Sequence, residues 1–418
     1  MCLRRVAQGS WARETQYGRF LGNGRVTLDK LIAGWSERTG AATVGRHVLA
    51  IQDTSEIKFA TTAQDRRGLG KVKKGNSHGV LLHAMIGVDA DHDILLGLVG
   101  GQIWTRQGDV ATPHAKRTLA DKESARWIDT AAQARQVLAG AATITLVADR
   151  ESDIYAHWAR SPGGPVHLLT RLMHDHAVVE GGTVRPALAA LPIAAQSVIA
   201  LRERVERPPR DAKVRLRFAA MTLKRPRNTI EKGLPEGVGV HVVEIFEAEP
   251  PPGVEPVHWI LLTTHAVRSA ADAWRVVGWY QRRWNIEQFF RTMKRQGLRI
   301  EDSQLTSADR LLKLVAIAAH AAAIVMQLVQ ARDGREPQPA SLAFAPDEVA
   351  LIARINQRIQ GKTARQKNPH PPDTLAWAAW VIAKLGGWHE YQAKPPGPIT
   401  LFNGLTTFRA AATVLRLV

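Results

Sequence analysis

Short apolar runs separated by turn-forming residues fill the first part of the chain, a pattern that is typical of strands. Five segments form this part: apolar runs of strand length at residues 48–53, 79–88, 94–104 and 142–148, and a helical pattern at residues 121–139. The order strand, strand, strand, helix, strand predicts a mixed sheet with helices packed on it, and therefore an α/β fold.

The pattern changes between residues 166 and 264. Prolines divide this part into short pieces, and polar and apolar residues alternate from Arg215 to Phe218, as expected of a half-buried strand. Residues 258–263 form its last strand-like run. We interpret this part as an all-β insertion that carries Arg and Lys on one face.

Helical patterns dominate the remainder, at residues 270–296 and 308–331 and in a C-terminal region where residues 373–385 end at Gly386 and Gly387. A short helix is expected at residues 27–37, and a polar, proline-containing linker at residues 333–339. The predicted domains are an N-terminal helical region at 1–45, an α/β core at 46–165 and 265–331, the β-rich insertion at 166–264, and a helical region at 340–418.

The charge balance indicates a polyanionic partner. The chain has 56 Lys and Arg against 38 Asp and Glu, a net charge of +18, and such an excess would repel itself unless nucleic acid binds to it. A generally basic proteome, or association with ribosomes, is the alternative explanation. Cys2 is the only cysteine, so no disulfide forms within the chain and a reducing cytoplasm is expected.

No membrane association is expected. The N-terminus has basic residues but lacks the apolar core of a signal peptide. Residues 314–331 lack charge, but His320, Gln327 and Gln330 interrupt them. This stretch is therefore interpreted as a buried helix.

Two aspartates share a position relative to predicted strands. Asp53 follows the apolar run that starts at residue 48, and Asp149 follows the run 142–148. The carboxyl ends of strands are where ligands bind in such sheets, and the ends of parallel neighbours lie about 4.8 Å apart. Both carboxylates could then contact one ion. For either residue alone, an aspartate that caps the following turn is the alternative.

A third feature lies in the predicted helix 270–296. Tyr280, Arg283, Glu287 and Lys294 project into an arc of about 60° on one helix face. A solvated face with an Arg283–Glu287 ion pair would explain two of them. The tyrosine and the second cation instead favour a face that holds phosphate oxygens beside a carboxylate.

The spacing Tyr–x2–Arg–x3–Glu–x6–Lys resembles the YREK signature of the insertion-sequence-four transposases, a DDE group that includes the transposase of transposon five. Asp53-Thr54-Ser55 and the run from Asp149 to Ile154 resemble its two aspartate motifs, and Lys122-Glu123-Ser124 with Trp127 resembles the helix between them. Leu385-Gly386-Gly387 falls in a matching C-terminal segment. The resemblance covers residues 15–410.

The resemblance implies a ribonuclease-H-like core with a β-rich insertion before the glutamate helix. By matching position, Asp53, Asp149 and Glu287 would be the catalytic, metal-binding triad. Three residues of the signature, Tyr280, Arg283 and Lys294, would bind DNA phosphates. Two further DNA contacts are Trp259, which would stack on a flipped base unless it is a core residue of its strand, and Arg171, which would contact the backbone.

The resemblance also implies the chemistry and the partners. Mg²⁺ prefers oxygen ligands, and two such ions, which Mn²⁺ could replace, would serve an in-line displacement at phosphorus. Water would free a 3′-hydroxyl at the transposon end, and a hairpin would form and reopen before strand transfer. The expected partners are double-stranded DNA, as transposon ends and target, and a second copy of the chain, bound together at the nucleoid in the cytoplasm.

Three other functions remain open. Members of the family have a longer region ahead of the first aspartate, so the first alternative is a truncated, non-catalytic regulator that binds DNA or forms mixed dimers. The second is another ribonuclease-H-like nuclease, such as a junction resolvase, which has no reason to share the YREK spacing. The third is a structural DNA-binding protein, which does not explain why Asp53 and Asp149 follow strands.

Overall fold

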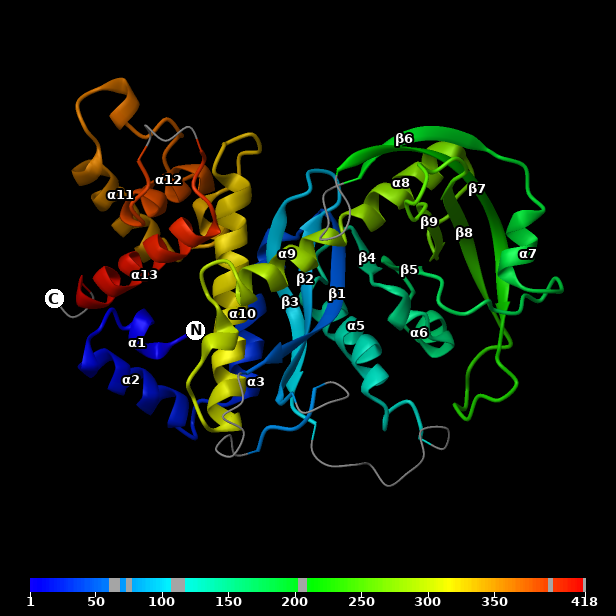
Figure 1. Ribbon diagram of the computed structural model, residues 1–418, viewed down its shortest axis with the longest axis horizontal. Coiled ribbons are helices and arrows are strands. Elements are labelled where there is room, and N and C mark those ends of the chain that lie inside the picture. The colour runs from blue at the N-terminus through cyan, green and yellow to red at the C-terminus, as the bar shows by residue number, and fades with distance from the viewer. Residues whose placement is uncertain (60–67, 73–76, 107–116, 202–208, 390–393, 416–418) are drawn as a thin grey trace.

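One mixed sheet of nine strands runs through the residues that the structure, a computed structural model, describes: 1–59, 68–72, 77–106, 117–201, 209–389 and 394–415 (Figure 1). The strands follow one another across the sheet in the order β3-β2-β1-β4-β5-β9-β8-β7-β6. Their bounds are β1 His47–Lys58, β2 Gly79–Asp89, β3 Leu95–Trp104, β4 Thr143–Val147, β5 Val166–Arg171, β6 Ala195–Leu201, β7 Arg210–Lys224, β8 Gly237–Glu247 and β9 His258–Thr263. The predicted mixed α/β fold is confirmed.

The helices lie mainly before, between and after the strands of the sheet. In the N-terminal part these are α1 Leu3–Val6, α2 Trp11–Gly22, α3 Leu28–Ala33 and α4 Thr39–Ala42. Between strands lie α5 Arg126–Val137, α6 Tyr155–Arg160 and α7 Val184–Ala189. After the last strand come α8 Ala270–Gln281, α9 Trp284–Lys294, α10 Ala308–Ala331, α11 Pro346–Ile359, α12 Leu375–Leu385 and α13 Pro398–Leu415.

The centre of the sheet is parallel and both of its wings are antiparallel. Strand β1 pairs in parallel with β4, from His47 opposite Thr143 to Ile51 opposite Val147, and β4 pairs in parallel with β5. The antiparallel pairing of β1 with β2 continues much further, to Lys58. Asp53 was therefore wrongly placed at a strand end: the apolar pattern stops near Ile51, but β2 still supplies backbone hydrogen bonds to the polar residues that follow.

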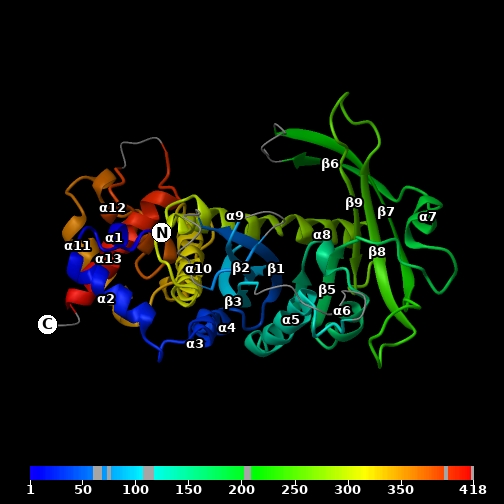
Figure 2. The same cartoon turned by 60° about the horizontal axis from the view of Figure 1, so that its bottom comes forward.

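Both faces of the central strands are buried. Leu49 and Ile51 of β1 belong to a core shared with α8, α9 and α10, whereas Val48 and Ala50 belong to a second core with α5 and α6. This alternation follows from the two-residue period of a strand. Figure 2 shows the two layers, with α8 and α9 on one side of the sheet and α5 and α6 on the other. Asp53 has the parity of Leu49 and Ile51, so it faces α8 and α9.

The segment 166–264 does not form a sheet of its own. Strand β5 pairs with β4, and β9 pairs with β5, so the remaining strands extend the core sheet without a break. The segment is also not all-β, because it contains the helix Val184–Ala189. Val184 and Leu188 of this helix are buried. Periodicity missed the helix because it is only six residues long.

The predicted single helix 270–296 is divided. Helix α8 ends at Gln281 and α9 begins at Trp284. Between them the N–H groups of Arg282 and Arg283 bond three residues back, to the carbonyls of Trp279 and Tyr280. Such bonds tighten the helix for about a turn without bending it sharply, and α8 and α9 remain nearly in line (Figure 2).

Helix α10 has the predicted bounds, 308–331, and packs through the middle of the molecule. By length and composition it is the one helix among the described residues that could cross a membrane, and 67% of its most apolar window is buried within the protein. The C-terminal helices lie on the other side of α10 from β4 and β5 (Figure 1). Close contact of α12 with α13 depends on Gly404, because a Cβ there would lie 1.8 Å from the carbonyl oxygen of Ile382.

Candidate active site

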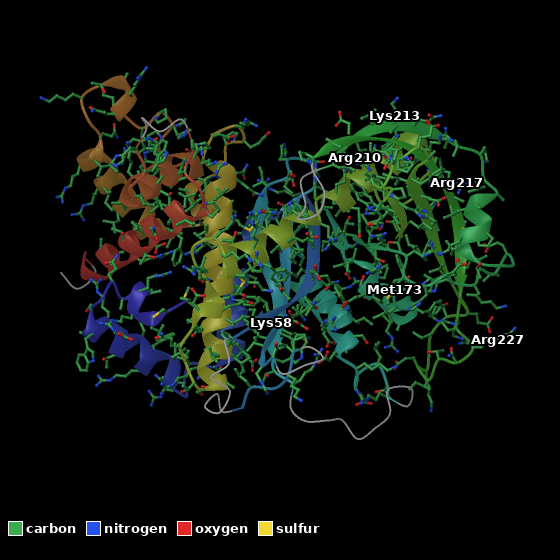
Figure 3. All side chains as sticks on the ribbon, viewed as in Figure 1. Lys58, Met173, Arg210, Lys213, Arg217 and Arg227 are labelled. Carbon is green, nitrogen blue, oxygen red and sulfur yellow. The ribbon has the colours of Figure 1, made fainter. Side chains whose placement is uncertain are left out.

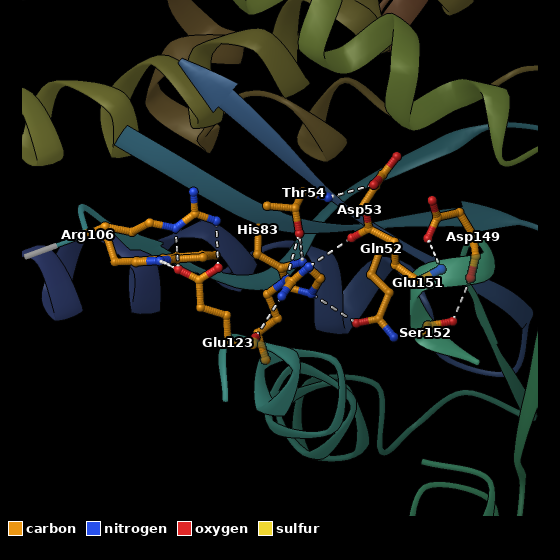
Figure 4. A network of polar contacts seen from close by, with 11 residues as sticks. Gln52, Asp53, Thr54, His83, Arg106, Glu123, Asp149, Glu151 and Ser152 are labelled. Atoms are coloured by element: carbon orange, nitrogen blue, oxygen red, sulfur yellow. Dashed lines mark hydrogen bonds and ion pairs between the residues drawn. The ribbon is translucent and has the colours of Figure 1, made fainter. Parts of the chain in front are cut away.

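Asp53 lies just beyond the point where β1 and β4 stop pairing. The last parallel pair is Ile51 with Val147, so β1 continues along β2 while the chain after β4 turns away. Asp149 lies two residues past β4 in this turn, where its Oδ1 accepts the backbone N–H of Glu151 at 2.9 Å. The Ser152 hydroxyl donates to the Asp149 carbonyl oxygen, also at 2.9 Å (Figure 4). Asp149 thus caps a turn, as the simpler interpretation predicted, and it does so beside Asp53.

Arg283 joins Asp53 to Glu287. Its Nη1 donates to Asp53 Oδ2 at 3.1 Å, and its Nη2 donates to Glu287 Oε1. The Arg283 side chain is 17% exposed, compared with 21% for that of Asp53 and 33% for that of Glu287. One half-buried cation therefore lies between two carboxylates that come from β1 and α9.

The carboxylates also influence one another. The pKa of Asp53 is raised to about 7, mainly by burial and next by the negative charge of Asp149, while the Arg283 guanidinium opposes the rise. The charge of Glu287 adds a smaller increase to this pKa. Asp53, Asp149 and Glu287 are therefore close enough to interact electrostatically, although they lie on three different segments.

The donor chemistry of this site fits a hard divalent cation, since all three groups are carboxylates. Their present arrangement does not yet form a ligand cage: among the described residues, no three His, Cys, Asp or Glu side chains are grouped closely enough to hold a metal ion. The Arg283 guanidinium fills the space between Asp53 and Glu287. These two carboxylates are thus paired with a cation that the chain itself provides.

Lys294 contacts the same strand further along. Its Nζ donates to Ser55 Oγ at 2.7 Å and to the carbonyl oxygen of Glu56. Burial lowers the pKa of Lys294. Arg283, Glu287 and Lys294 therefore all face β1, despite the break between α8 and α9.

Tyr280 lies in a neighbouring group with Trp259 and Arg171. Tyr280 is 7% exposed, and its ring packs edge-on against that of Trp259 with centroids 5.6 Å apart. Burial raises the pKa of Tyr280, and the nearby charges of Arg283 and Arg171 oppose the rise. Arg171 Nη2 donates to the His258 carbonyl oxygen at 2.9 Å, next to Trp259. The structure thus places Trp259 and Arg171 beside Tyr280, near the end of α8.

Sequence reasoning missed Arg126, at the beginning of α5. Its Nε donates to Thr54 Oγ1 at 2.8 Å, and its Nη2 donates to Glu151 Oε2 at 3.1 Å. The side chain is 11% exposed. Arg126 therefore ties the residue after Asp53 to the turn that follows Asp149. It lies between Glu123 and Trp127, both of which are part of the family resemblance. The contacts of its side chain depend on the folded sheet, so the sequence alone did not reveal them.

A buried polar network supports the contact between Arg126 and Thr54, on the face of β1 opposite to Asp53. Thr54 Oγ1 also bonds His83 Nδ1 at 2.9 Å, and His83 Nε2 lies 3.2 Å from Gln52 Oε1 (Figure 4). The Trp127 ring packs edge-on against His83 at 4.7 Å. His83 therefore bonds both Gln52 and Thr54, the two neighbours of Asp53, and so fixes the backbone that carries Asp53.

Fewer cations of the β-rich segment are free to bind an anionic partner than their number suggests. Arg210, Lys213 and Arg217 lie along β7, with Arg227 beyond its end (Figure 3). Cross-strand carboxylates neutralise two of them: Arg210 pairs with Glu247 at 2.6 Å, and Arg217 pairs with Glu244. Part of the positive charge of this segment therefore stabilises the sheet.

The chain is similar to known proteins in sequence and, more distantly, in structure. The family model described as "Transposase DDE domain" matches residues 45–324, more than half of the chain. The structure is similar to that of the piggyBac transposase in a synaptic complex with hairpin DNA, with a TM-score of 0.36 and 9% sequence identity over 70% of this chain and 49% of that one. The chain thus spans about half the length of the transposase that it matches.

Proposed function

The chain belongs to the transposases with a DDE domain, and we propose that it is a cut-and-paste DNA transposase of the insertion-sequence-four group with the YREK signature. In this proposal Asp53, Asp149 and Glu287 are the catalytic triad on a ribonuclease-H-like core. The observation that carries it is the convergence of three carboxylates from three segments, where the charges of Asp149 and Glu287 both raise the pKa of Asp53. Acidic groups gathered at such a cost in repulsion are typical of functional sites.

The three carboxylates would hold Mg²⁺, or Mn²⁺ in its place, once Arg283 has moved away from them. The metal would supply charge stabilisation to an oxygen displacement at phosphorus, with two ions as the expected number. The chain's own part is to position the ligands: β1 and β2 fix Asp53, the capped turn fixes Asp149, and α9 presents Glu287. Arg126 connects the first two of these supports.

The proposed reaction is hydrolysis at a transposon end, which frees a 3′-hydroxyl, followed by attack of that hydroxyl on target DNA. Arg283 and Lys294 would bind backbone phosphates beside the carboxylates, with Tyr280 as a further contact. Trp259 and Arg171, which adjoin Tyr280, would contact the same strand, Trp259 by stacking on a base. The net charge of +18 suits such a partner.

The domain roles belong to the same proposal. The helical segment 1–45 would contact DNA, the segment 166–264 would extend the DNA surface of the core, and residues 340–418 would join two copies of the chain in the complex with both transposon ends. The protein would act at the nucleoid in the cytoplasm.

A second candidate function is a non-catalytic regulator that binds DNA or forms mixed dimers. One observation favours it: Arg283 occupies two of the three carboxylates, and the described residues contain no ready three-ligand metal site. A transposase cuts the DNA that it binds, whereas the regulator does not, and this difference can be measured.

The test is a cleavage assay with the purified chain and linear duplex DNA that carries the inverted repeats flanking its gene. We expect strand cleavage at the repeat ends with Mg²⁺ or Mn²⁺ and none with EDTA. The matched substrate has the same composition with scrambled repeats. Binding without cleavage under every metal condition would favour the regulator.

A further inference from the structure

A cavity of about 510 Å³ lies among the C-terminal helices. These helices are on the other side of α10 from β4 and β5 (Figure 1). The cavity opens between the end of α10, the segment that joins α11 to α12, and the chain just before α13. Its size falls within the range of small-molecule sites, about 300–1,000 Å³. The residues that give it chemical character are Arg332, Arg365, Lys367, His370, Trp380 and Trp388.

The rim of this cavity is cationic. Arg365 and Lys367 are exposed and lie on one short segment, and the half-buried Arg332 also lines the cavity. Asp333 is the one acidic residue in the lining, and its Oδ2 already pairs with Arg335 Nε at 2.9 Å. The cavity therefore presents a net positive charge to a ligand.

The segment that carries these cations is ordered by its own hydrogen bonds. Thr363 and Gln366 form a capping box around a short 3-10 turn. The Gly361 N–H donates to the Gln366 carbonyl oxygen at 3.1 Å. Arg365 and Lys367 are thus presented from a fixed turn, which lowers the entropy cost of binding an anion with both.

The walls are aromatic and apolar. Trp380, on α12, is 4% exposed, and Trp388 is half-buried, with its Nε1 donating to the Lys394 carbonyl oxygen at 3.1 Å. Lys384 Nζ lies 5.0 Å from the Trp380 ring centroid and 5.4 Å from that of Trp388, so a cation holds the two indoles together. Arg332 Nη1 donates to the Pro396 carbonyl oxygen at 2.9 Å, so these two lining residues are bonded to each other.

We propose that this cavity binds one nucleotide, with its phosphate at Arg365 and Lys367 and its planar base against the tryptophan and proline walls. Cations position phosphates, and flat apolar side chains accept any base, so the combination fits a nucleotide better than an inorganic anion. The source of the nucleotide rests on the proposed function: it belongs to a DNA strand that passes the C-terminal helices while another part of the DNA occupies the candidate active site.

The test compares two charge-matched double variants of the full chain. Arg365→Ala with Lys367→Ala removes the cations at the rim. Arg354→Ala with Arg358→Ala removes two exposed cations from α11, outside the lining. Affinity for a labelled single strand and a labelled duplex is measured by fluorescence anisotropy at several salt concentrations. We expect the rim variant to lose affinity about tenfold, and the α11 variant no more than about twofold.

A cross-linking arm locates the nucleotide directly. DNA with photoreactive bases is irradiated with the wild-type chain, and the modified peptides are mapped by mass spectrometry. Modification of Trp388 or His370 supports the proposal, and so does a weaker DNA complex for Trp388→Leu at an unchanged melting temperature. Calorimetry with dAMP distinguishes a nucleotide of a DNA strand from a free nucleotide. The cavity belongs to a free nucleotide if dAMP binds tightly, the rim variant abolishes that binding, and the DNA affinity of the rim variant is unchanged.

The proposal is overturned if the rim and α11 variants weaken DNA binding equally, because the effect is then one of general charge. It is also overturned if no cross-link maps to the cavity and dAMP does not bind. Failure of the proposed transposase function is a separate outcome, since it appears as absent DNA cleavage and leaves these affinities unaffected.

Discussion

Arg283 and Asp53 are 230 positions apart in the chain, yet Nη1 of the arginine lies 3.1 Å from Oδ2 of the aspartate. The same guanidinium donates to Glu287 one helical turn away. This ion pair connects β1 to the junction between α8 and α9. It also provides positive charge at the place where the proposed reaction requires it.

Arg283 and a divalent cation should compete for the same carboxylates. We expect Arg283→Ala to bind Mn²⁺ about fivefold more tightly than the wild type, because a competing cation is removed, and to bind DNA more weakly, because a phosphate contact is lost. Calorimetry with Mn²⁺ and anisotropy with DNA measure the two effects. Arg282→Ala, which removes the neighbouring charge, is the control. Weaker Mn²⁺ binding by Arg283→Ala would show that the arginine organises the carboxylates and does not compete for them.

Arg126 should position the two aspartates. We expect Arg126→Gln to lower the free energy of unfolding by about 1–3 kcal/mol, because Thr54 and Glu151 lose a charged partner, and to weaken Mn²⁺ binding about tenfold. Arg106→Gln breaks the neighbouring pair with Glu123, which is 2.7 Å long, and should leave Mn²⁺ affinity unchanged. Urea unfolding and Mn²⁺ calorimetry separate the two effects. A loss of stability with full Mn²⁺ affinity would limit Arg126 to a structural role.

Asp53 should destabilise the metal-free protein at neutral and higher pH. Its pKa rises from 3.8 to about 7 on folding, so the folded protein takes up a proton that the unfolded chain releases. The stability contribution of Asp53 is therefore lost as pH rises from about 4 through 7. With EDTA at ~pH 8, we expect Asp53→Asn to be more stable than the wild type by about 1–4 kcal/mol, a difference that disappears near pH 4.

Urea unfolding at both pH values measures this difference, and Asp129→Asn, on the exposed surface of α5, serves as the control. An Asp53→Asn variant less stable than the wild type at ~pH 8 would mean that the bond to Arg283 outweighs the burial of the charge.

Local pattern was enough to predict much of the fold. The largely apolar helix 308–331 and the apolar strand ahead of Asp149 were both predicted from the sequence, and the structure contains both. The division at Arg282 and Arg283 was not predictable, because both residues fit a helix and only the hydrogen bonds back to Trp279 and Tyr280 reveal the tighter turn. The end of β1 was also misjudged, since its polar half is a strand only because β2 lies beside it.

The sequence indicated which residues could gather at the site but not how they would be paired. Asp53, Asp149 and Glu287 were predicted from strand ends and from the signature. That Arg283 would lie between two of them depends on the packing of α9 against β1. The pairing of Arg210 with Glu247 likewise depends on the register of β7 and β8. Such contacts join segments far apart in the chain, and no local pattern encodes them.

In the proposed function, Asp53, Asp149 and Glu287 together perform metal-dependent DNA cleavage. The most direct measurement is the rate of Mg²⁺-dependent cleavage of repeat-end DNA by Asp53→Asn, Asp149→Asn and Glu287→Gln, with Asp302→Asn, an exposed acid paired with Arg299, as the control. We expect each of the three to cut at least about a hundredfold more slowly than the wild type and to bind DNA within about threefold of it, while Asp302→Asn retains full activity. Cleavage at the wild-type rate by any one of the three would contradict the account.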